Sequence, residues 1–358
     1  MTRVLMKGNE AIAEAAIRAG CLHFFGYPIT PQNEIPEYFS RRLPQVGGEY
    51  VQTESEVATS NMIFGAAGVG VRVMTSSSSP GISLMSEGIS YLAGADLPVV
   101  IVNMMRAGPG LAGILPSQSD YAHATRGTAH GDFELTVLAP SSVQEAVDLT
   151  ILSFQIAERY RVPVMLLGDG MIGQMMEPVE FPELEVGPPL AADDWALTGC
   201  RGREPRLVSS LYLDPVELND KNYERYRRYA LIRDKETRFD TYNCDGPYDV
   251  LLTAFGVMAR VCMSAIDELA KEGIRVGLFR PITLNPFPED ACRSAIARAK
   301  RVLDVEMNMG QMLVDIRLAA RGSHDIDFIG KCGGLTPSVE DVVERVRVHL
   351  AAIRAEER

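Results

Sequence analysis

The sequence predicts an α/β protein with two parallel-sheet domains, the first larger than the second. Short apolar runs alternate with amphipathic helical stretches from the start of the chain. The pattern breaks near Pro178 into prolines and charges, and the same alternation returns at Asp249. Strands that are apolar at nearly every position and separated by helices are typical of a parallel sheet covered on both faces.

The first domain is predicted to cover residues 1–185. Its strands are expected to alternate with helices, and Pro98–Met104 is expected to lead into a Gly/Pro loop. The expected strands are Arg3–Met6, His23–Tyr27, Tyr50–Gln52, Val71–Thr75, Pro98–Met104, Leu135–Leu138 and Pro163–Leu167. The expected helices are Asn9–Arg18, Gln32–Arg42, Glu56–Ala67, Gly81–Leu92 and Ser142–Arg159.

Residues 186–245 are predicted to be a linker because they show no sustained period. A loop of that length is uncommon, so a short helix near Val216–Tyr229 is expected to pack against one domain. The second domain is predicted to cover residues 246–358 and to end in an amphipathic helix. Its expected elements are the strands Asp249–Ala254, Arg275–Phe279 and Arg301–Glu306 and the helices Val257–Glu272, Glu289–Ala299 and Ser338–Arg354.

Composition limits the classes of function. The chain has 358 residues, 46% of them hydrophobic, which is enough apolar material for two cores. With 47 acidic and 35 basic residues its formal charge is −12, which disfavours a nucleic-acid surface, so a small anionic substrate would need a local cation. No apolar run approaches the roughly 20 residues that cross a bilayer. The N-terminus does not resemble a signal peptide, so a cytoplasmic protein without a membrane partner is expected.

The cysteines and histidines do not predict a metal site. The six cysteines are scattered, without the closely spaced pairs that zinc or iron-sulfur sites need, so any cluster is expected on another chain. They are expected to be buried, reduced and hydrophobic in role. The five histidines show no metal-ligand spacing and no serine-nucleophile pattern. Of the polar clusters, His130-Gly131-Asp132 fits a turn better than a site.

Two strand ends carry the first candidate functional residues. Thr30 lies between Pro28 and Pro31, which restrict the backbone, so it can present its hydroxyl to a ligand or cap the following helix. After the next strand one of the carboxylates of Glu54 and Glu56 is expected to face inward, either to complement the helix dipole or to hold a ligand.

Two further loops follow strands. Arg106 enters a glycine-rich loop, where it can grip a carboxylate or remain a solvated surface arginine. Ser76–Ser79 can cap a helix or receive a polar ligand. Gly168-Asp169-Gly170 is similar to the start of the signature that holds magnesium and the diphosphate of thiamine. The asparagine that completes this signature is missing, since the next one is Asn219, so we interpret the segment as a turn.

Together these motifs resemble the alpha subunit of 2-oxoacid:ferredoxin oxidoreductases, most closely the 3-methyl-2-oxobutanoate (branched-chain, ketoisovalerate) type, along nearly the whole chain. The motifs that carry the resemblance are Met6–Ala11, Gly26–Pro31, Glu54–Glu56 with its helix to Ala67, Thr75–Gly81, the Arg106 loop, His130–Asp132 and Glu306–Gln311. The resemblance implies a pyrimidine-binding thiamine-diphosphate domain followed by a smaller domain like the C-terminal domain of transketolases, which is mainly structural.

The resemblance also implies residue roles. Glu56 matches the catalytic glutamate that hydrogen-bonds the aminopyrimidine of thiamine and stabilises its imino tautomer, whose nitrogen removes the thiazolium C2 proton. Pro28 matches a cofactor contact, and Thr30 and Arg106 match contacts to the substrate carbonyl and carboxylate. Glu54 is then a bystander.

The implied reaction is oxidative decarboxylation of a 2-oxo acid with coenzyme A to acyl-CoA, carbon dioxide and reduced ferredoxin. Thiamine diphosphate would be shared with a beta subunit that binds the diphosphate and Mg²⁺, and iron-sulfur clusters would lie on a ferredoxin-like partner. The chain begins directly with the pyrimidine domain, so a separate gamma subunit is implied. The sequence Gly-Pro-Gly-Leu-Ala-Gly after Arg106 favours an apolar substrate tail. The alternatives are a 2-oxoglutarate enzyme and a non-catalytic scaffold subunit.

Overall fold

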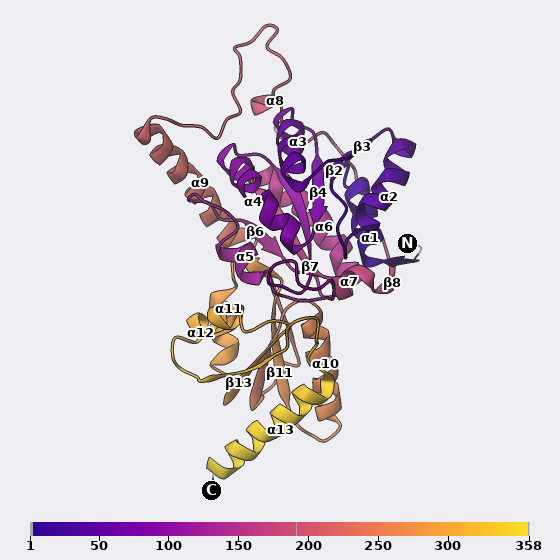
Figure 1. The fold of residues 1–358 in the computed structure, drawn as a ribbon. Coiled ribbons are helices and arrows are strands. Elements are labelled where there is room, and N and C mark those ends of the chain that lie inside the picture. The colour runs from indigo at the N-terminus through magenta and orange to yellow at the C-terminus, as the bar shows by residue number, and fades with distance from the viewer. Residues whose placement is uncertain (1–2, 191, 357) are drawn as a thin grey trace.

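The structure is a computed structural model that describes residues 3–190, 192–356 and 358. Within these residues the chain forms a seven-stranded sheet, a five-stranded sheet and a separate pair of strands. The sheets belong to two units that lie one below the other, with the N-terminal unit at the top of the view (Figure 1). None of the helices in the described part of the chain is long and apolar enough to cross a membrane.

The larger sheet has the strand order β12-β6-β7-β5-β4-β2-β3, and its pairs are parallel except for β12 with β6. Every residue of β4, β5 and β7 is buried, as expected for strands covered on both faces. The parallel strands are β2 (His23–Gly26), β3 (Glu49–Gln52), β4 (Val73–Ser77), β5 (Val99–Met105), β6 (Thr136–Leu138) and β7 (Pro163–Asp169).

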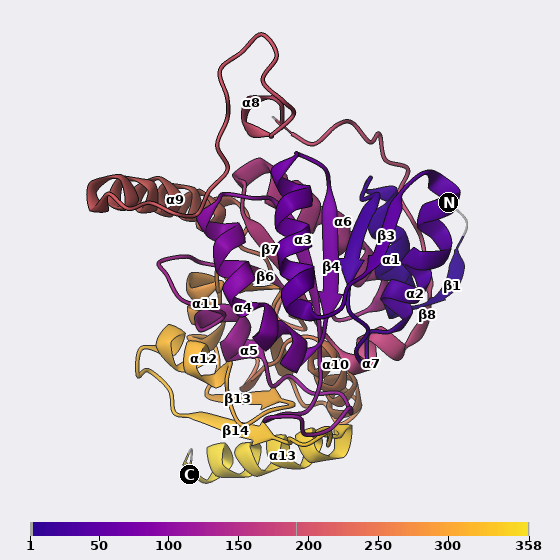
Figure 2. The same cartoon turned by 45° about the horizontal axis from the view of Figure 1, so that its top comes forward.

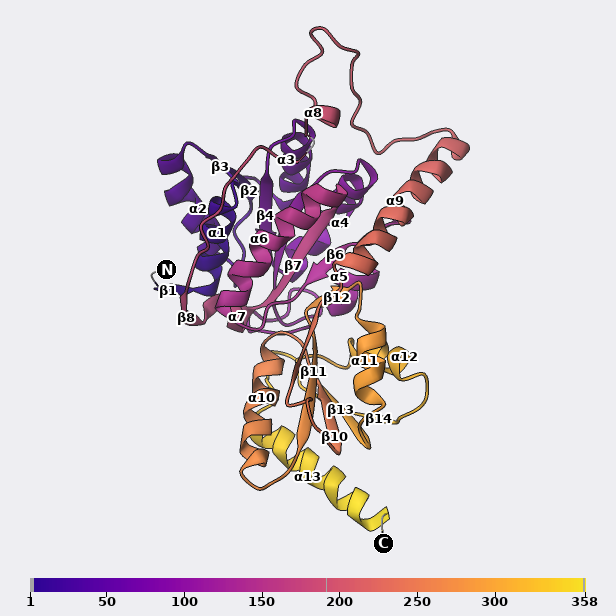
Figure 3. The same cartoon turned by 180° about the vertical axis from the view of Figure 1, so that it is seen from behind.

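Two layers of helices cover this sheet. Helices α1 (Gly8–Arg18), α2 (Glu34–Arg42) and α6 (Val143–Tyr160) pack on one face (Figure 3). Helices α3 (Glu56–Gly68) and α4 (Ser79–Gly94) pack together on the other (Figure 2). The neighbouring strands β2 and β4 therefore lead into helices on opposite faces. In open α/β sheets this arrangement creates a ligand-binding crevice at the carboxyl ends of the strands.

The smaller sheet has the order β14-β13-β10-β11-β9, parallel except for β9 at its edge. Its strands are β9 (Phe239–Tyr242), β10 (Val250–Thr253), β11 (Val276–Pro281), β13 (Arg301–Glu306) and β14 (Ile326–Gly330). Helices α10 (Val257–Ala270) and α13 (Val339–Glu356) pack together, as do α11 (Glu289–Ile296) and α12 (Leu313–Ala320) on the other side of the sheet (Figure 3). This unit lies below the carboxyl ends of the first sheet (Figure 1).

The strand predicted at Arg3–Met6 does not join the parallel sheet. It forms β1 (Val4–Lys7), which pairs antiparallel with β8 (Met176–Val179) in the separate two-stranded sheet. Val4 and Leu5 are exposed, so an apolar run at this position does not mark a core strand.

The segment predicted as a linker contains more structure than expected. The short helix is α9 (Pro215–Lys235), 21 residues long, and it packs against the first unit as predicted: Arg225 Nε lies 3.1 Å from Asp96 Oδ1. Helix α8 (Ala192–Trp195) also lies in this segment, and β9 belongs to the second sheet. Conversely, β12 (Thr283–Asn285) pairs with β6 of the first sheet. The boundaries 1–185, 186–245 and 246–358 stay a prediction.

Candidate functional site

Four strands of the larger sheet direct their carboxyl ends toward one region. The loops after β2, β4, β5 and β7 contact one another there. Ser76 Oγ, near the end of β4, donates to Gln32 Oε1 at 2.5 Å, and Arg106 Nη1, after β5, donates to the Thr30 carbonyl at 3.1 Å. A Cβ atom at Gly170, after β7, would lie 3.1 Å from Pro31 Cγ. The segments that carry Thr30, Ser76, Arg106 and Gly170 therefore form one site.

Glu56 is the first residue of α3 and is 6% exposed, whereas Glu54 is exposed. The prediction that one of these carboxylates faces inward is confirmed. The cap of α3 is made by Ser55, whose hydroxyl accepts from the Ala58 N–H at 3.2 Å, so Glu56 is not needed for that purpose. Within the described residues the Glu56 carboxylate has no hydrogen-bond partner. A carboxylate at this position without a donor from the chain is free to accept a hydrogen bond from a ligand.

Gly81 allows helix α4 to approach Glu56 closely. A Cβ atom at position 81 would lie 2.6 Å from Glu56 Oε1 and 2.0 Å from Ser77 Oγ. Real side-chain atoms do not come so close, so glycine is required here for the carboxylate to keep its place.

The run from the end of β4 to the start of α4 adds buried hydroxyls to the site. The hydroxyls of Thr75, Ser77 and Ser78 are buried and have no partner among the described residues. Ser78 precedes α4 as its N-cap residue, but its side chain makes no capping bond. Capping therefore does not account for these hydroxyls, and they remain available to a polar ligand.

Arg106 is 6% exposed, which makes the alternative of a solvated surface arginine wrong. Its Nη1 donates to the Thr30 carbonyl at 3.1 Å and its Nη2 to the Leu111 carbonyl at 3.3 Å, while its Nε is buried without a partner. In the described part of the chain no carboxylate pairs with this guanidinium. A buried cation held only by carbonyl groups is suited to an anionic ligand.

The backbone of Arg106 is fixed by Ser79, from the serine run that the sequence singled out, and by three residues that the sequence did not identify. Its N–H donates to Ser79 Oγ at 3.0 Å, and this hydroxyl donates to Asp120 Oδ2 at 2.6 Å. Asn103 Nδ2 also donates to Asp120 Oδ2, and Ser119 Oγ donates to the Arg106 carbonyl at 2.9 Å. Asn103 lies within β5, and Ser119 and Asp120 lie in the loop before residue 121, where short polar side chains are too common to single them out.

The loop with Pro28 and Thr30 borders the same site. Pro28 is exposed and Thr30 is half-buried. The alternative that Thr30 caps a helix at Gln32 is wrong, because α2 begins at Glu34 and its N-cap Asn33 instead donates to Thr30 Oγ1 at 3.5 Å. Buried Asn9 holds this loop through a 2.8 Å bond to the Pro31 carbonyl, which gives the motif Met6–Ala11 a structural role.

Gly168-Asp169-Gly170 is not a turn, because β7 ends at Asp169 and helix α7 (Gly170–Gln174) begins at once. Asp169 Oδ1 accepts from the N–H groups of Met171 and Ile172, both at 3.0 Å, and Oδ2 accepts from the Val257 N–H of the second unit at 3.3 Å. Burial raises the pKa of this carboxyl to about 6. The side chain thus caps α7 and contacts α10.

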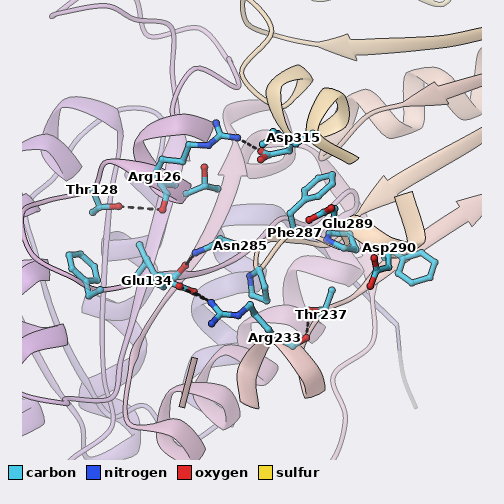
Figure 4. A pocket seen from close by; sticks show the side chains of 18 of the residues that line it. Arg126, Thr128, Glu134, Arg233, Thr237, Asn285, Phe287, Glu289, Asp290 and Asp315 are labelled. Atoms are coloured by element: carbon cyan, nitrogen blue, oxygen red, sulfur yellow. Dashed lines mark hydrogen bonds and ion pairs between the residues drawn. The ribbon is translucent and has the colours of Figure 1, made fainter. Parts of the chain in front are cut away.

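A pocket of about 800 Å³ lies away from these residues, between helix α5 (Tyr121–Arg126), the end of α9 and the second unit (Figure 4). None of Pro28, Thr30, Glu56 and Arg106 lines it. Its arginines are neutralised by neighbouring acids: Arg126 pairs with Asp315, and Arg233 lies 2.5 Å from Glu134. His130-Gly131-Asp132 lies in a bend beside it, where the His130 carbonyl accepts from Ser90 Oγ.

The expectation that the cysteines are buried holds for four of the six. Cys21, Cys244, Cys262 and Cys292 are buried, and burial raises the pKa of the Cys21 and Cys292 thiols to about 12. Cys200 and Cys332 are exposed, so the prediction is wrong for these two.

Comparison with known proteins identifies the family to which this chain belongs. Residues 14–213 match the family described as pyruvate flavodoxin/ferredoxin oxidoreductase, thiamine diphosphate-binding. Residues 248–342 match core domain II of pyruvate:ferredoxin oxidoreductase. The chain therefore belongs to the thiamine-diphosphate-dependent 2-oxoacid:ferredoxin oxidoreductases and is an oxidoreductase subunit.

Its relatives narrow this assignment. The ketoisovalerate oxidoreductase subunit VorB of Methanothermobacter thermautotrophicus is 47% identical over 347 residues, which cover 97% of this chain and 98% of that protein. The 2-oxoglutarate synthase subunit KorA of Archaeoglobus fulgidus is 38% identical over 322 residues, covering 88% of this chain and 91% of that protein. The resemblance to the alpha subunit of the ketoisovalerate type is thus confirmed.

Solved structures agree with the fold. A 2-oxoglutarate:ferredoxin oxidoreductase from Magnetococcus marinus, with 2-oxoglutarate, coenzyme A and succinyl-CoA bound, matches with a TM-score of 0.87 at 26% identity. The match covers 97% of this chain but 65% of that one, so this chain spans just under two thirds of its length. A split gene transketolase, an inactive beta4 tetramer, matches with a TM-score of 0.57 at 13% identity, covering 97% of this chain and 98% of that one, which supports the fold alone.

Proposed function

We propose that this chain supplies the aminopyrimidine-binding half of a thiamine diphosphate site in an enzyme that oxidatively decarboxylates a branched-chain 2-oxo acid with coenzyme A. The buried Glu56 carboxylate without a partner carries the proposal. An aminopyrimidine ring can donate a hydrogen bond to it. The hydroxyls of Ser77 and Ser78 and the backbone approach at Gly81 fit a flat polar ring beside Glu56.

The residues of this chain have distinct roles in the proposal. Thiamine diphosphate, when bound, supplies the nucleophilic carbon that attacks the 2-oxo group and accepts the electron pair left by carbon dioxide. Glu56 holds a proton at the edge of the aminopyrimidine and releases it during activation. Pro28 contacts the cofactor from the loop after β2.

Arg106 binds the substrate carboxylate in the proposal. Its guanidinium is buried, has no acidic partner in the described chain and keeps Nε free. It also fixes the carbonyl of Thr30, so the residue assigned to the substrate oxo group lies beside it. A cation placed in this way can pair with a carboxylate without first losing another ion pair.

An apolar substrate tail agrees with the loop that follows Arg106. Residues 107–115 carry no charged side chain, and Leu111, Ile114 and Leu115 are exposed. The loop therefore offers apolar contacts and no cation for a second carboxylate. This supports a branched-chain 2-oxo acid over 2-oxoglutarate, in line with the name of the relative that is 47% identical.

The rest of the site is assigned to partners. A beta subunit would hold the diphosphate and Mg²⁺, a ferredoxin-like subunit the iron-sulfur clusters, and a gamma subunit would complete the complex. The relatives named above are themselves subunits. Apart from Glu56 itself, helices α3 and α4 carry one charged residue, Glu87. Their outer surface beside Glu56 exposes the apolar side chains of Val57, Met62 and Leu84. Such a patch is suited to a protein interface. A cytoplasmic location remains part of the proposal.

The test is reconstitution with the proposed partners. Reduction of ferredoxin or viologen is measured with 3-methyl-2-oxobutanoate and with 2-oxoglutarate, and kcat/KM is expected to favour the branched-chain acid by at least roughly tenfold. A preference for 2-oxoglutarate would contradict the substrate assignment but not the family. A complex with full activity when Glu56 is replaced would support a scaffold subunit instead.

A further inference from the structure

We infer that Gln311, in the loop between β13 and α12 of the second unit, is a positioning residue for Arg106. The inference rests on the proposed function, in which Arg106 binds the substrate carboxylate. It gives the second unit a part in substrate binding, whereas the resemblance implied a mainly structural domain.

Gln311 grips the segment that follows the Arg106 loop. Its Nε2 donates to the Ser119 carbonyl at 2.7 Å, and its Oε1 accepts from the Ala122 N–H at 2.7 Å. One amide side chain therefore satisfies a backbone acceptor and a backbone donor that lie three residues apart. These bonds connect parts of the chain about 190 residues apart.

Residues 119–120 in turn hold the N–H and the carbonyl group of Arg106. Ser119 donates its hydroxyl to the Arg106 carbonyl, and Asp120 accepts the hydroxyl proton of Ser79, to which the Arg106 N–H donates. A shift of residues 119–120 would therefore move Arg106 at its carbonyl and, through Ser79, at its N–H. The guanidinium is otherwise fixed by backbone carbonyls, which move with their own loops.

Gln311 is itself held in place. Its N–H donates to Asn308 Oδ1 at 3.0 Å, and Asn308 Nδ2 donates to the Gln118 carbonyl at 2.9 Å. Gln118 and Met307 exchange two further bonds, 3.1 Å between N–H and carbonyl and 3.0 Å between Met307 N–H and Gln118 Oε1. Gln118 and Asn308 are buried, so this contact forms a rigid base.

Gln311 differs from Asn308 and Gln118 because it is half-buried and its side-chain bonds go only to residues 119 and 122. Its replacement should leave the bonds among Gln118, Met307 and Asn308 intact and loosen residues 119–122, which hold Arg106. A misplaced binding group weakens substrate binding even when its own chemistry is unchanged.

The experiment compares Gln311→Met, which keeps the length but loses the side-chain bonds, with Gln144→Met. Gln144, on α6, makes the same pair of backbone bonds to residue 180: it donates to the carbonyl at 3.0 Å and accepts from the N–H at 2.7 Å. It is far in sequence from the residues of the candidate site, so it serves as the control. In the reconstituted complex Gln311→Met should raise the KM of the 2-oxo acid roughly tenfold with kcat changed less than about twofold. Hydrogen exchange at residues 106–122 should quicken, and Gln144→Met should change neither.

Arg106→Ala serves as the reference and should raise the same KM while thiamine retention is unchanged. The double variant Arg106→Ala/Gln311→Met should then be no worse than Arg106→Ala, because Gln311 acts through Arg106. The inference is overturned if exchange at residues 106–122 or the KM is unchanged in Gln311→Met, or if the two effects on KM multiply. If Arg106→Ala leaves the KM unchanged, the proposed function of Arg106 fails instead.

Discussion

Two buried glutamates, Glu56 in the larger unit and Glu306 in the smaller one, show how different two similar positions can be. Both lie between a strand and the helix that follows it: Glu56 is the first residue of α3, and Glu306 is the last residue of β13. Both are at most 6% exposed. Glu306 accepts from Asn308 Nδ2 at 2.7 Å, from the Met312 N–H at 2.9 Å and from the Leu313 N–H at 3.0 Å. Glu56 accepts no bond from the described residues.

In the proposed function this difference separates a structural carboxylate, Glu306, from a functional one, Glu56. The donors around Glu306 are all within the chain, so its burial is compensated when the chain folds. Glu56 has no such donor among the described residues. Folding therefore supplies hydrogen-bond donors to the Glu306 carboxylate, whereas the described residues supply none to the Glu56 carboxylate.

The largest expected effect, and the strongest test of the contrast between the two glutamates, is that of Glu56→Gln. The variant should assemble normally but turn over about 10² to 10⁴ times more slowly, because an amide cannot relay the proton. Turnover is measured by viologen reduction in the complex, with Glu54→Gln as the matched control on the exposed neighbour. Near-normal turnover in Glu56→Gln would indicate a scaffold subunit.

Glu306→Gln should have the opposite profile. The amide nitrogen would face an N–H donor, which costs about 2 kcal/mol of folding free energy. Chemical unfolding of the isolated chain should show this loss, while Glu56→Gln should be as stable as the parent chain or more so. If both variants lose the same stability, the contrast between the two glutamates is wrong.

Gly81→Ala tests whether the close packing of α4 holds the Glu56 carboxylate in its position. The added Cβ would lie 2.6 Å from Glu56 Oε1 and 2.0 Å from Ser77 Oγ, so both side chains must move. We expect turnover to fall roughly tenfold, since small misplacements at a reacting group are costly. Gly65→Ala is the control, because a Cβ there meets nothing within 4 Å.

The smallest effect concerns Asp169, a buried carboxylate at the contact between the units. Burial raises its pKa from 3.8 to about 6 in the folded chain. Between these values the unfolded chain binds fewer protons than the folded chain, so stability should fall as pH rises. The expected loss is about 1 kcal/mol per pH unit. Denaturant unfolding near pH 4.5 and 5.5 measures it, and Asp169→Asn should remove this part of the slope. An unchanged slope would mean that Asp169 ionises normally.

The sequence predicted the elements that are buried on both faces. Strands β5 and β7 were found because nearly all of their residues are apolar, and β4 because it begins with Val73 and Met74; all three are buried along the whole run. Strand β9 was missed because Phe239, Asp240 and Thr241 are exposed at a sheet edge, which leaves no apolar run. Helix α9 was expected to be shorter, since only Arg225, Tyr229 and Ile232 of its 21 residues are buried.

The site was predictable in part. The strand ends that carry Thr30, Glu56 and Arg106 followed from the alternation of elements, and the structure brings Thr30 and Arg106 into contact. The residue pattern did not decide which of Glu54 and Glu56 faces inward, because burial depends on packing against α4. The bonds of Gln311 to Ser119 and Ala122 could not be predicted, since they connect distant segments through backbone groups.

Strand β12 bears on how members of this family could exchange domains during evolution. Thr283 and Asn285 pair with β6, so the smaller unit completes the edge of the larger sheet. A chimera joined near residue 246 would bring a foreign edge strand to β6, and a chain ending there would leave the polar backbone of β6 open to pairing with other chains. Successful recombination would therefore have to preserve the fit between residues 283–285 and 136–138 as well as the junction itself.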